Sequence, residues 1–158
     1  MNLNETLLQK RNDSQPTSIG RHSWSHSFTD HGWTVTLATD QVDTVGSLLW
    51  ELSLQRIGEP VAVDLKQWAS RIASQVTGLM EPLTVHEVDA TSHEAILRSE
   101  SPAKRGESKL YYEVRLTGDS QAVVRRYQYS PDVAKRVQVA FALTHEAMAK
   151  LASDIAGE

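Results

Sequence analysis

The chain has 158 residues, a common size for one domain, and such a chain buries roughly 70% of its unfolded surface. Its formal net charge is -4, from 16 Lys and Arg against 20 Asp and Glu, which argues against non-specific binding of nucleic acid. The absence of cysteine excludes disulfides and thiolate metal sites and fits a reducing compartment. Because we find no signal-peptide pattern and no run of 18 apolar residues, we expect a cytoplasmic protein without a membrane segment.

The first twenty residues are mostly polar, which predicts a flexible N-terminal segment over 1–20. A short helix is the alternative, because Leu3, Leu7 and Leu8 could pack against the body of the protein. The remainder, 21–158, has no internal repeat and no second shift in composition, so we expect it to form a single α+β domain.

Two stretches that alternate with a period of two follow the N-terminal segment. One face of this pattern carries His22, Trp24, His26 and Phe28 from the first stretch and Trp33, Val35 and Leu37 from the second. The residues Asp30 to Gly32 between them suit a turn, so the pattern predicts a β-hairpin with one aromatic face.

The segment 42–57 fits two structures. A strand places Leu48, Trp50, Leu52 and Leu54 on one face, whereas a helix aligns Val42, Val45, Leu49 and Leu52. Because Gly46 weakens a helix interior, we favour the strand.

The next elements are a middle helix and a second hairpin. Asp64 is typical of an N-cap, and the apolar residues after it have helical spacing: Leu65, Trp68, Ile72 and Val76. Beyond Pro82, LTVHEVDA and EAILRSE alternate on either side of a turn-like Thr91 to His93. We expect the following SPAKRGES segment to be an exposed loop.

The last third predicts a third hairpin and then a long amphipathic helix. With Asp119 and Ser120 at the tip, the predicted pairs are Leu116–Val123, Tyr112–Tyr127 and Leu110–Tyr129 on an apolar face and Glu113–Arg126 on a solvated face. Ser130 would cap the helix and Pro131 would begin it. Its apolar stripe would comprise Val137, Phe141, Thr144, Met148, Leu151 and Ile155, packed on the apolar sheet face.

Together these elements predict an α+β fold: an antiparallel sheet of about six to seven strands with the middle helix and a long C-terminal helix packed on one face. With 42–57 as a strand, the order of elements is loosely similar to that of small acidic secretion chaperones, which dimerise and bind extended segments of client proteins. With 42–57 as a helix, the order resembles a helix-grip arrangement, whose cleft commonly holds a ligand. Both resemblances rest on element order and not on shared motif residues.

No motif of useful specificity indicates catalysis, a metal, a cofactor or nucleic acid. His22 and His26 would lie about 13 Å apart along a strand, which is too far for one ion to bridge directly, and a site there would also need a third ligand such as His31. His145 begins HEAMA, which lacks the second histidine of a zincin helix, and no glycine-rich phosphate loop is present. Lys104 and its basic neighbours alternate with acidic residues, which indicates a mixed surface. We therefore expect no catalytic residue, metal or cofactor, and no nucleic-acid partner.

Binding residues can be suggested only from the predicted register. Arg125 would share a face with Tyr127, and a buried guanidinium there would need an anionic partner, with Tyr112 and Tyr127 flanking it. We favour the simpler interpretation that Arg125 lies near the end of the sheet and extends to water, and keep the anion site as the alternative. A ligand cavity would contain Arg125 or His86.

Self-association is the other expected property. Val139 and Leu143 lie off the main stripe of the predicted helix, and with Trp50 they could form an apolar patch for a homodimer. Exposed edge strands offer a second route.

The function favoured by these patterns is a non-catalytic protein-interaction or chaperone-like module, with a protein client as a partner. The alternatives are a small-ligand-binding domain, with a cleft between the sheet and the C-terminal helix, and an enzyme of unrecognised type.

Overall fold

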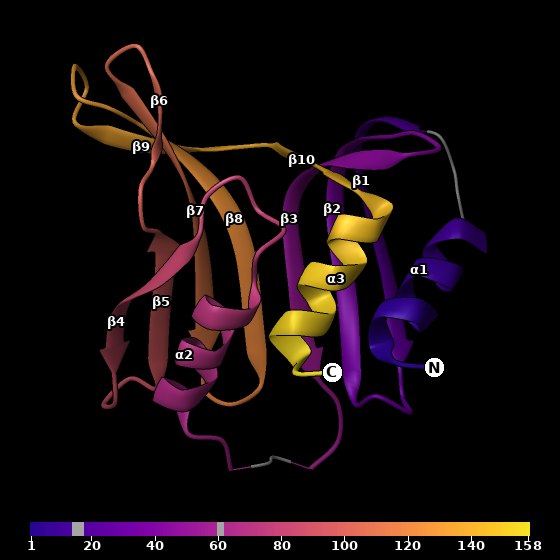
Figure 1. Cartoon of the computed structure of the whole chain (residues 1–158). Helices are drawn as coiled ribbons and strands as arrows, with labels where there is room; N and C mark the ends of the chain where they lie inside the picture. The colour runs from indigo at the N-terminus through magenta and orange to yellow at the C-terminus, as the bar shows by residue number, and fades with distance from the viewer. Residues whose placement is uncertain (14–17, 60–61) are drawn as a thin grey trace.

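The computed structural model describes residues 1–13, 18–59 and 62–158. In these residues the chain forms three helices and a ten-stranded antiparallel sheet (Figure 1). The helices are α1 (Leu3–Asp13), α2 (Leu65–Gln75) and α3 (His145–Ala156). The strands are β1 (Ser18–Phe28), β2 (Trp33–Val42), β3 (Gly46–Arg56), β4 (Leu83–Asp89), β5 (Glu94–Ser99), β6 (Ala103–Arg105), β7 (Ser108–Thr117), β8 (Gln121–Ser130), β9 (Lys135–Val139) and β10 (Phe141–Thr144).

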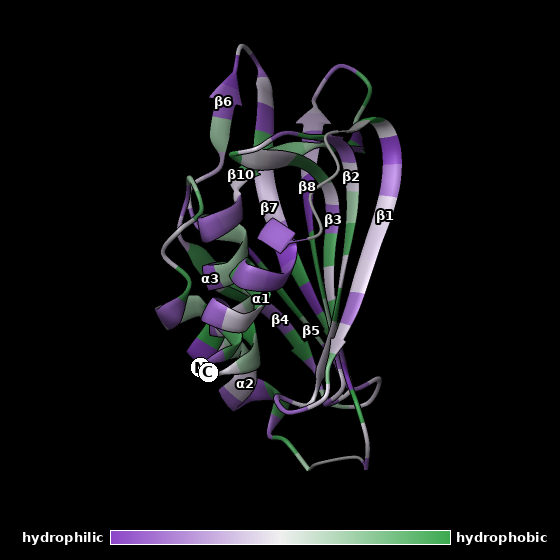
Figure 2. Cartoon of the chain, turned by 90° about the vertical axis from the view of Figure 1, so that its right-hand side faces the viewer, coloured by the Kyte–Doolittle hydropathy of each residue, from purple (hydrophilic) through white to green (hydrophobic). Residues whose placement is uncertain are grey.

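The strands lie in the order β1-β2-β3-β8-β7-β5-β4, with β6 paired to β7, β9 to β8 and β10 to β3. The three helices lie on one face of this sheet, which we call the helix face, and they leave the opposite, open face uncovered (Figures 1 and 2). The connection through α2 carries the chain from β3 in the centre to β4 at the far edge. The α+β class, the antiparallel sheet and the position of the helices on one face agree with the sequence prediction.

Several predicted elements are confirmed. The first two hairpins form as β1–β2 and β4–β5, and the ambiguous segment 42–57 contains strand β3 and no helix. Asp64 caps α2, because its carboxylate accepts hydrogen bonds from the N–H groups of Lys66 and Gln67 at 3.0 and 3.2 Å.

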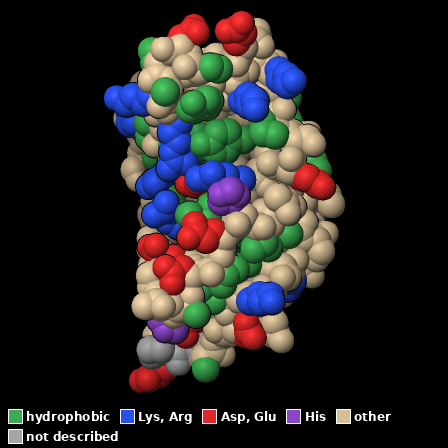
Figure 3. Space-filling model, turned by 90° about the vertical axis from the view of Figure 1, so that its left-hand side faces the viewer, with side chains coloured by type: hydrophobic (Ala, Val, Ile, Leu, Met, Phe, Trp, Pro, Cys, Tyr) green, Lys and Arg blue, Asp and Glu red, His purple; other side chains and the backbone are tan. Residues whose placement is uncertain are grey.

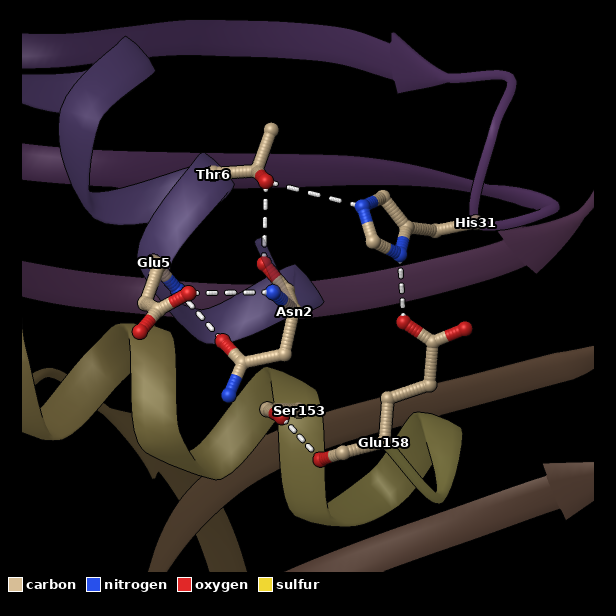
Figure 4. A network of polar contacts seen from close by, with 6 residues as sticks. All are labelled: Asn2, Glu5, Thr6, His31, Ser153 and Glu158. Carbon is tan, nitrogen blue, oxygen red and sulfur yellow. Dashed lines mark hydrogen bonds and ion pairs between the residues drawn. The ribbon is translucent and has the colours of Figure 1, made fainter.

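The N-terminal residues form a packed helix, in contrast to the flexible segment expected over 1–20. Asn2 and Glu5 make a reciprocal capping box: each side chain accepts a hydrogen bond from the backbone N–H of the other, at 2.9 and 3.1 Å (Figure 4). Leu3 and Leu7 are fully buried. The helical alternative is therefore the one the structure adopts for residues 3–13, and residues 14–17 lie outside the described ranges.

The two ends of the chain meet at the turn between β1 and β2. His31 contacts Glu158 through Nδ1 at 2.5 Å and Thr6 through Nε2 at 3.5 Å, and the Ser153 hydroxyl donates a hydrogen bond to the Glu158 carbonyl (Figure 4). These contacts connect α1, the turn and the end of α3.

The predicted long C-terminal helix is wrong in its first half. Pro131 does not begin a helix but occupies a turn, in which the N–H of Val133 bonds to the carbonyl of Ser130 at 3.3 Å. The chain then forms β9 and β10, and α3 begins only at His145, capped by Thr144. The β-branched Val137 and Val139 alternate with polar residues, which is the period of a strand.

The number of strands also exceeds the predicted six to seven. The additional strands are β6, β9 and β10. Strand β6 lies in the segment expected to be a loop, where Gly106 at φ +61° allows a tight turn into β7.

The register of the third hairpin differs from the prediction by one residue. Tyr112 lies opposite Arg126, and Glu113 lies opposite Arg125, because the loop has three residues between Thr117 and Gln121 and not two. A one-residue slip exchanges the partners across the strands. Tyr112 and Arg126 therefore share the buried helix face, while Arg125 faces the open side.

The core lies between the helix face and the three helices. Five residues from the apolar stripes of the two predicted helices are all buried: Trp68, Ile72, Phe141, Met148 and Leu151. Phe141 reaches this core from β10 and not from a helix. None of the helices in the described residues has the length and hydropathy needed to cross a bilayer.

Candidate functional site

The structure separates the four residues suggested for binding. Arg125, Tyr127 and His86 belong to the open face, whereas Tyr112 lies on the helix face with 2% of its surface exposed. The predicted arrangement of Tyr112 and Tyr127 on either side of Arg125 is therefore wrong, since the register slip moves Tyr112 to the other side of the sheet.

An ion network occupies the open face. The carboxylate of Glu113, which is 2% exposed, accepts hydrogen bonds from Arg98 at 3.1 Å and from Arg136 at 3.0 Å. Arg98 also lies 3.3 Å from Nε2 of His86. Seen from the β4 edge, basic side chains gather around a histidine at mid-height (Figure 3). Two guanidinium groups on one carboxylate leave this network with a net positive charge.

Aromatic rings enclose the same network. The guanidinium of Arg136 lies 4.0 Å from the centre of the Tyr127 ring, and that of Arg98 lies 5.5 Å from the Tyr111 ring. Burial lowers the pKa of Arg136, but its hydrogen bonds to Tyr111 and Glu113 outweigh this and raise the pKa above its ordinary value. Arg136 is therefore a permanent cation held in place by its neighbours.

Arg125 has its own partner on this face. Its guanidinium lies 2.6 Å from the carboxylate of Glu51, with 36% of the side chain exposed. Burial lowers the pKa of Arg125, but hydrogen bonds with Tyr127 and Glu51 raise it overall. Glu51 therefore supplies the carboxylate partner that a guanidinium on this face needs, and the partly exposed side chain of Arg125 also reaches water.

The buried arginine of this hairpin is Arg126, which lies on the helix face. Its guanidinium makes hydrogen bonds to both carboxylate oxygens of Glu81, at 3.0 and 3.5 Å, and lies 4.1 Å from the centre of the Tyr112 ring. Ser99 donates a further hydrogen bond to Glu81 at 3.1 Å. Burial raises the pKa of Tyr112, which keeps its hydroxyl neutral.

A groove of about 440 Å³ has Arg126 and Tyr112 in its lining. We call it the β6–β10 groove, because its lining comes from β6, β7, β8, the end of β9, β10 and the segment before β4. The lining residues are Met80, Ala103, Lys104, Arg105, Leu110, Tyr112, Arg126, Gln128, Val139, Ala140, Phe141 and Ala142.

The groove combines an apolar base with a basic rim. Phe141 and Tyr112 are nearly buried at its base, and their rings make an edge-to-face contact with centres 5.6 Å apart. Met80 stands at its margin with 79% of its surface exposed. The rim residues Lys104 and Arg105 are exposed, and no ion pair joins them to a carboxylate in the described residues. Such a surface can take up apolar side chains next to negative charges.

The three residues suggested for self-association do not form a helix surface, because none of them is helical. Val139 ends β9 and lines the groove, while Leu143 belongs to β10. Trp50 belongs to β3, where the guanidinium of Arg21 lies 4.2 Å from its ring. The predicted patch is therefore divided among three strands.

The histidines do not gather into a metal site. Within the described ranges, no group of three or more His, Cys, Asp or Glu side chains is arranged to hold an ion.

Sequence reasoning missed most of the groove. Lys104 and Arg105 were assigned to a loop, and Arg126 to the solvated face of its hairpin. The sequence does contain one usable signal, Gly118, because glycine readily adopts a positive φ such as the +57° found here. A loop of three residues that begins with Gly118 gives the observed register of the hairpin. Glu81 had no sequence signal, since its partner Arg126 is 45 residues away.

No family model, curated protein or solved structure matches the chain. Functional inference therefore rests on the geometry described above.

Proposed function

We propose that this protein is a non-catalytic protein-interaction module that holds an acidic, apolar segment of a client protein in the β6–β10 groove. The observation that carries the proposal is the combination of an apolar base and a basic rim in one open groove. This surface is locally basic although the whole chain has a net charge of -4. An acidic segment complements the rim, and apolar side chains of that segment would cover Met80 and the base.

The shape of the groove favours a segment of polypeptide over a compact ligand. Its lining extends from Lys104 on β6 across two strands to Phe141 on β10. Recognition of polypeptide segments commonly relies on such a groove, in which a few apolar anchors give affinity and flanking charges give specificity.

The test begins with a selection from a displayed peptide library of about a dozen residues per peptide, against the intact chain. We expect the selected peptides to combine Leu, Phe or Val with Asp and Glu. Fluorescence anisotropy with a labelled selected peptide then gives the dissociation constant. Lys104→Glu and Met80→Asp should each weaken binding by about tenfold, because the first reverses the rim charge and the second places a carboxylate beside the acidic peptide.

Two matched variants control for charge and for folding. Lys66→Glu makes the same charge reversal at an exposed position on α2, and Val45→Asp makes an equivalent change at a residue that is 67% exposed and outside the groove. Both should bind like the unmodified chain. Selected peptides without acidic residues, or affinities unaffected by Lys104→Glu and Met80→Asp, would overturn the proposal. Binding of a small organic anion in the groove, with no peptide selected, would replace it by the small-ligand alternative.

A further inference from the structure

The two edges of the sheet differ in how they are protected. The edge strand β4 carries Glu87 and Asp89 and has an irregular register between Val85 and Glu87. Charges and bulges of this kind prevent an edge strand from pairing with another chain.

The opposite edge strand, β1, lacks these devices over most of its length. From His22 to Phe28 it follows β2 in regular register, and this stretch contains no Lys, Asp, Glu or Pro. Figure 2 looks onto this edge, where no described helix or strand lies outside β1, and α1 lies beside it on the helix face. Within the part of the chain that the structure describes, no further strand pairs with the outer backbone N–H and C=O groups of β1, so these groups can pair with another strand.

The sequence of β1 is symmetric. The residues His22-Ser23-Trp24-Ser25-His26 read the same in both directions. When two copies of one strand pair antiparallel about a two-fold axis, one residue must lie opposite itself. With Trp24 at that position, His22 of one copy faces His26 of the other. In the same way, Ser23 of one copy faces Ser25 of the other.

We propose that β1 pairs antiparallel with β1 of a second copy of this chain, centred on Trp24, to form one continuous sheet. The partner is a second copy because this symmetric sequence places identical residue types opposite each other, His on His, Ser on Ser and Trp on Trp, when the strand pairs with itself. Because the two-fold axis is perpendicular to the sheet, the helix layers of both copies lie on the same side of the joined sheet.

Side chains on both faces suit this pairing. On the open face, the hydroxyls of Ser25 and Thr36 lie 3.0 Å apart, and those of Ser27 and Thr34 lie 2.8 Å apart, across β1 and β2. Ser23 facing the partner's Ser25 would extend this ladder of hydroxyl pairs by one strand.

On the helix face, the two Trp24 rings would meet at the axis. Trp24 is half-buried, and the guanidinium of Arg11 on α1 lies 5.1 Å from its ring. Pairing centred on Trp24 would therefore also bring α1 of each copy close to the axis. Contacts of α1 would matter, because a stable interface buries more area than one pair of short strands provides.

The experiment measures the mass of the full chain by sedimentation equilibrium at micromolar concentration. The expected mass is twice 17.6 kDa. In the double variant Ser23→Lys with Ser25→Lys, like charges would face each other across the axis, so we expect the monomer mass with an unchanged circular dichroism spectrum. The control Gln55→Lys adds one lysine on the open face of β3, away from the edge, and should remain dimeric.

Disulfide trapping tests the register, because the chain has no cysteine of its own. Pairing centred on Trp24 predicts covalent dimers on oxidation of the double variant Ser23→Cys with Ser25→Cys. The double variant Ser25→Cys with Ser27→Cys should give few, because these residues are not opposed.

A monomeric unmodified chain would overturn the inference, as would a dimer that survives both lysines. Preferential trapping by the second cysteine pair would reject the Trp24-centred register. Lys104→Glu should leave the mass unchanged, so failure of the groove proposal and failure of this one are distinguishable.

Discussion

The buried pair of Arg126 and Glu81 gives a quantitative test of the hairpin register. The two side chains are about 7% and 8% exposed, and the guanidinium contacts both carboxylate oxygens. Replacing one partner leaves the other charge buried and unpaired, which costs about 3–5 kcal/mol of unfolding free energy. We therefore expect Arg126→Met and Glu81→Gln each to lose stability in this range.

The adjacent arginine supplies the matched control. Arg125 pairs with Glu51, but these side chains are 36% and 28% exposed. Exposed pairs contribute about 0–1 kcal/mol, so Arg125→Met should have a small effect. The double variant Arg126→Met with Glu81→Gln removes both charges, and it should recover much of the loss seen in the single variants.

Urea denaturation followed by circular dichroism measures each free energy, with the slope m checked for constancy. The register predicted from sequence alone places Arg126 on the solvated face and Arg125 on the apolar face, so it predicts the reverse order of effects. A larger loss for Arg125→Met than for Arg126→Met would refute the structural argument. Additive losses in the double variant would show that Arg126 and Glu81 do not interact.

Three further predictions concern the core, the start of α3 and the response to acid. Phe141→Ala should cost about 3–5 kcal/mol in the same urea assay, because the ring is buried, and a loss below about 1 kcal/mol would place it at the surface. Thr144→Ala should destabilise by about 1 kcal/mol, since the Thr144 hydroxyl caps α3 through the N–H of Ala147, whereas a stabilised variant would mean that Thr144 lies inside a helix. Hydrogen bonds from the N–H groups of Gly46 and Val45 lower the pKa of Asp43, so its stabilisation is present above the ordinary pKa of 3.8 and is lost as pH falls through the lowered value. The stability difference between the unmodified chain and Asp43→Asn should therefore shrink below about pH 4, and a constant difference would contradict the assignment.

Local patterns in the sequence predicted the elements whose signals are local. The period-two pattern of β1 and β2 and the Asp64 cap of α2 each lie within a dozen residues, and the structure has these elements. The sequence of α1 also contains the capping pair Asn2 and Glu5, but the prediction did not use it and rested on the polar composition of residues 1–20. Its helix is stabilised by burial of Leu3 and Leu7, which composition alone does not reveal.

The candidate site was less predictable because it depends on pairing between distant residues. The loop after Thr117 has one residue more than the prediction assumed. With this longer loop, Arg126 lies opposite Tyr112 on the buried face and Arg125 lies on the open face, so a different arginine is buried. The partner of Arg126 lies in the segment between α2 and β4, where no pattern indicates a buried carboxylate. Composition and spacing could suggest an arginine on this hairpin but not its partner.

The residues that contradict the long C-terminal helix also create the proposed binding groove. Strands β3 and β8 pair directly only from Leu52 to Gln55, and beyond that point β3 pairs with β10 while β8 pairs with β9. The chain crosses from β8 to β3 at Ala140, which brings Val139 and Phe141 to the groove. This crossing requires the turn at Pro131 and an extended chain through Val137, and a helix begun at Pro131 would abolish it. The Pro131 turn is thus a determinant of the groove as well as of the fold.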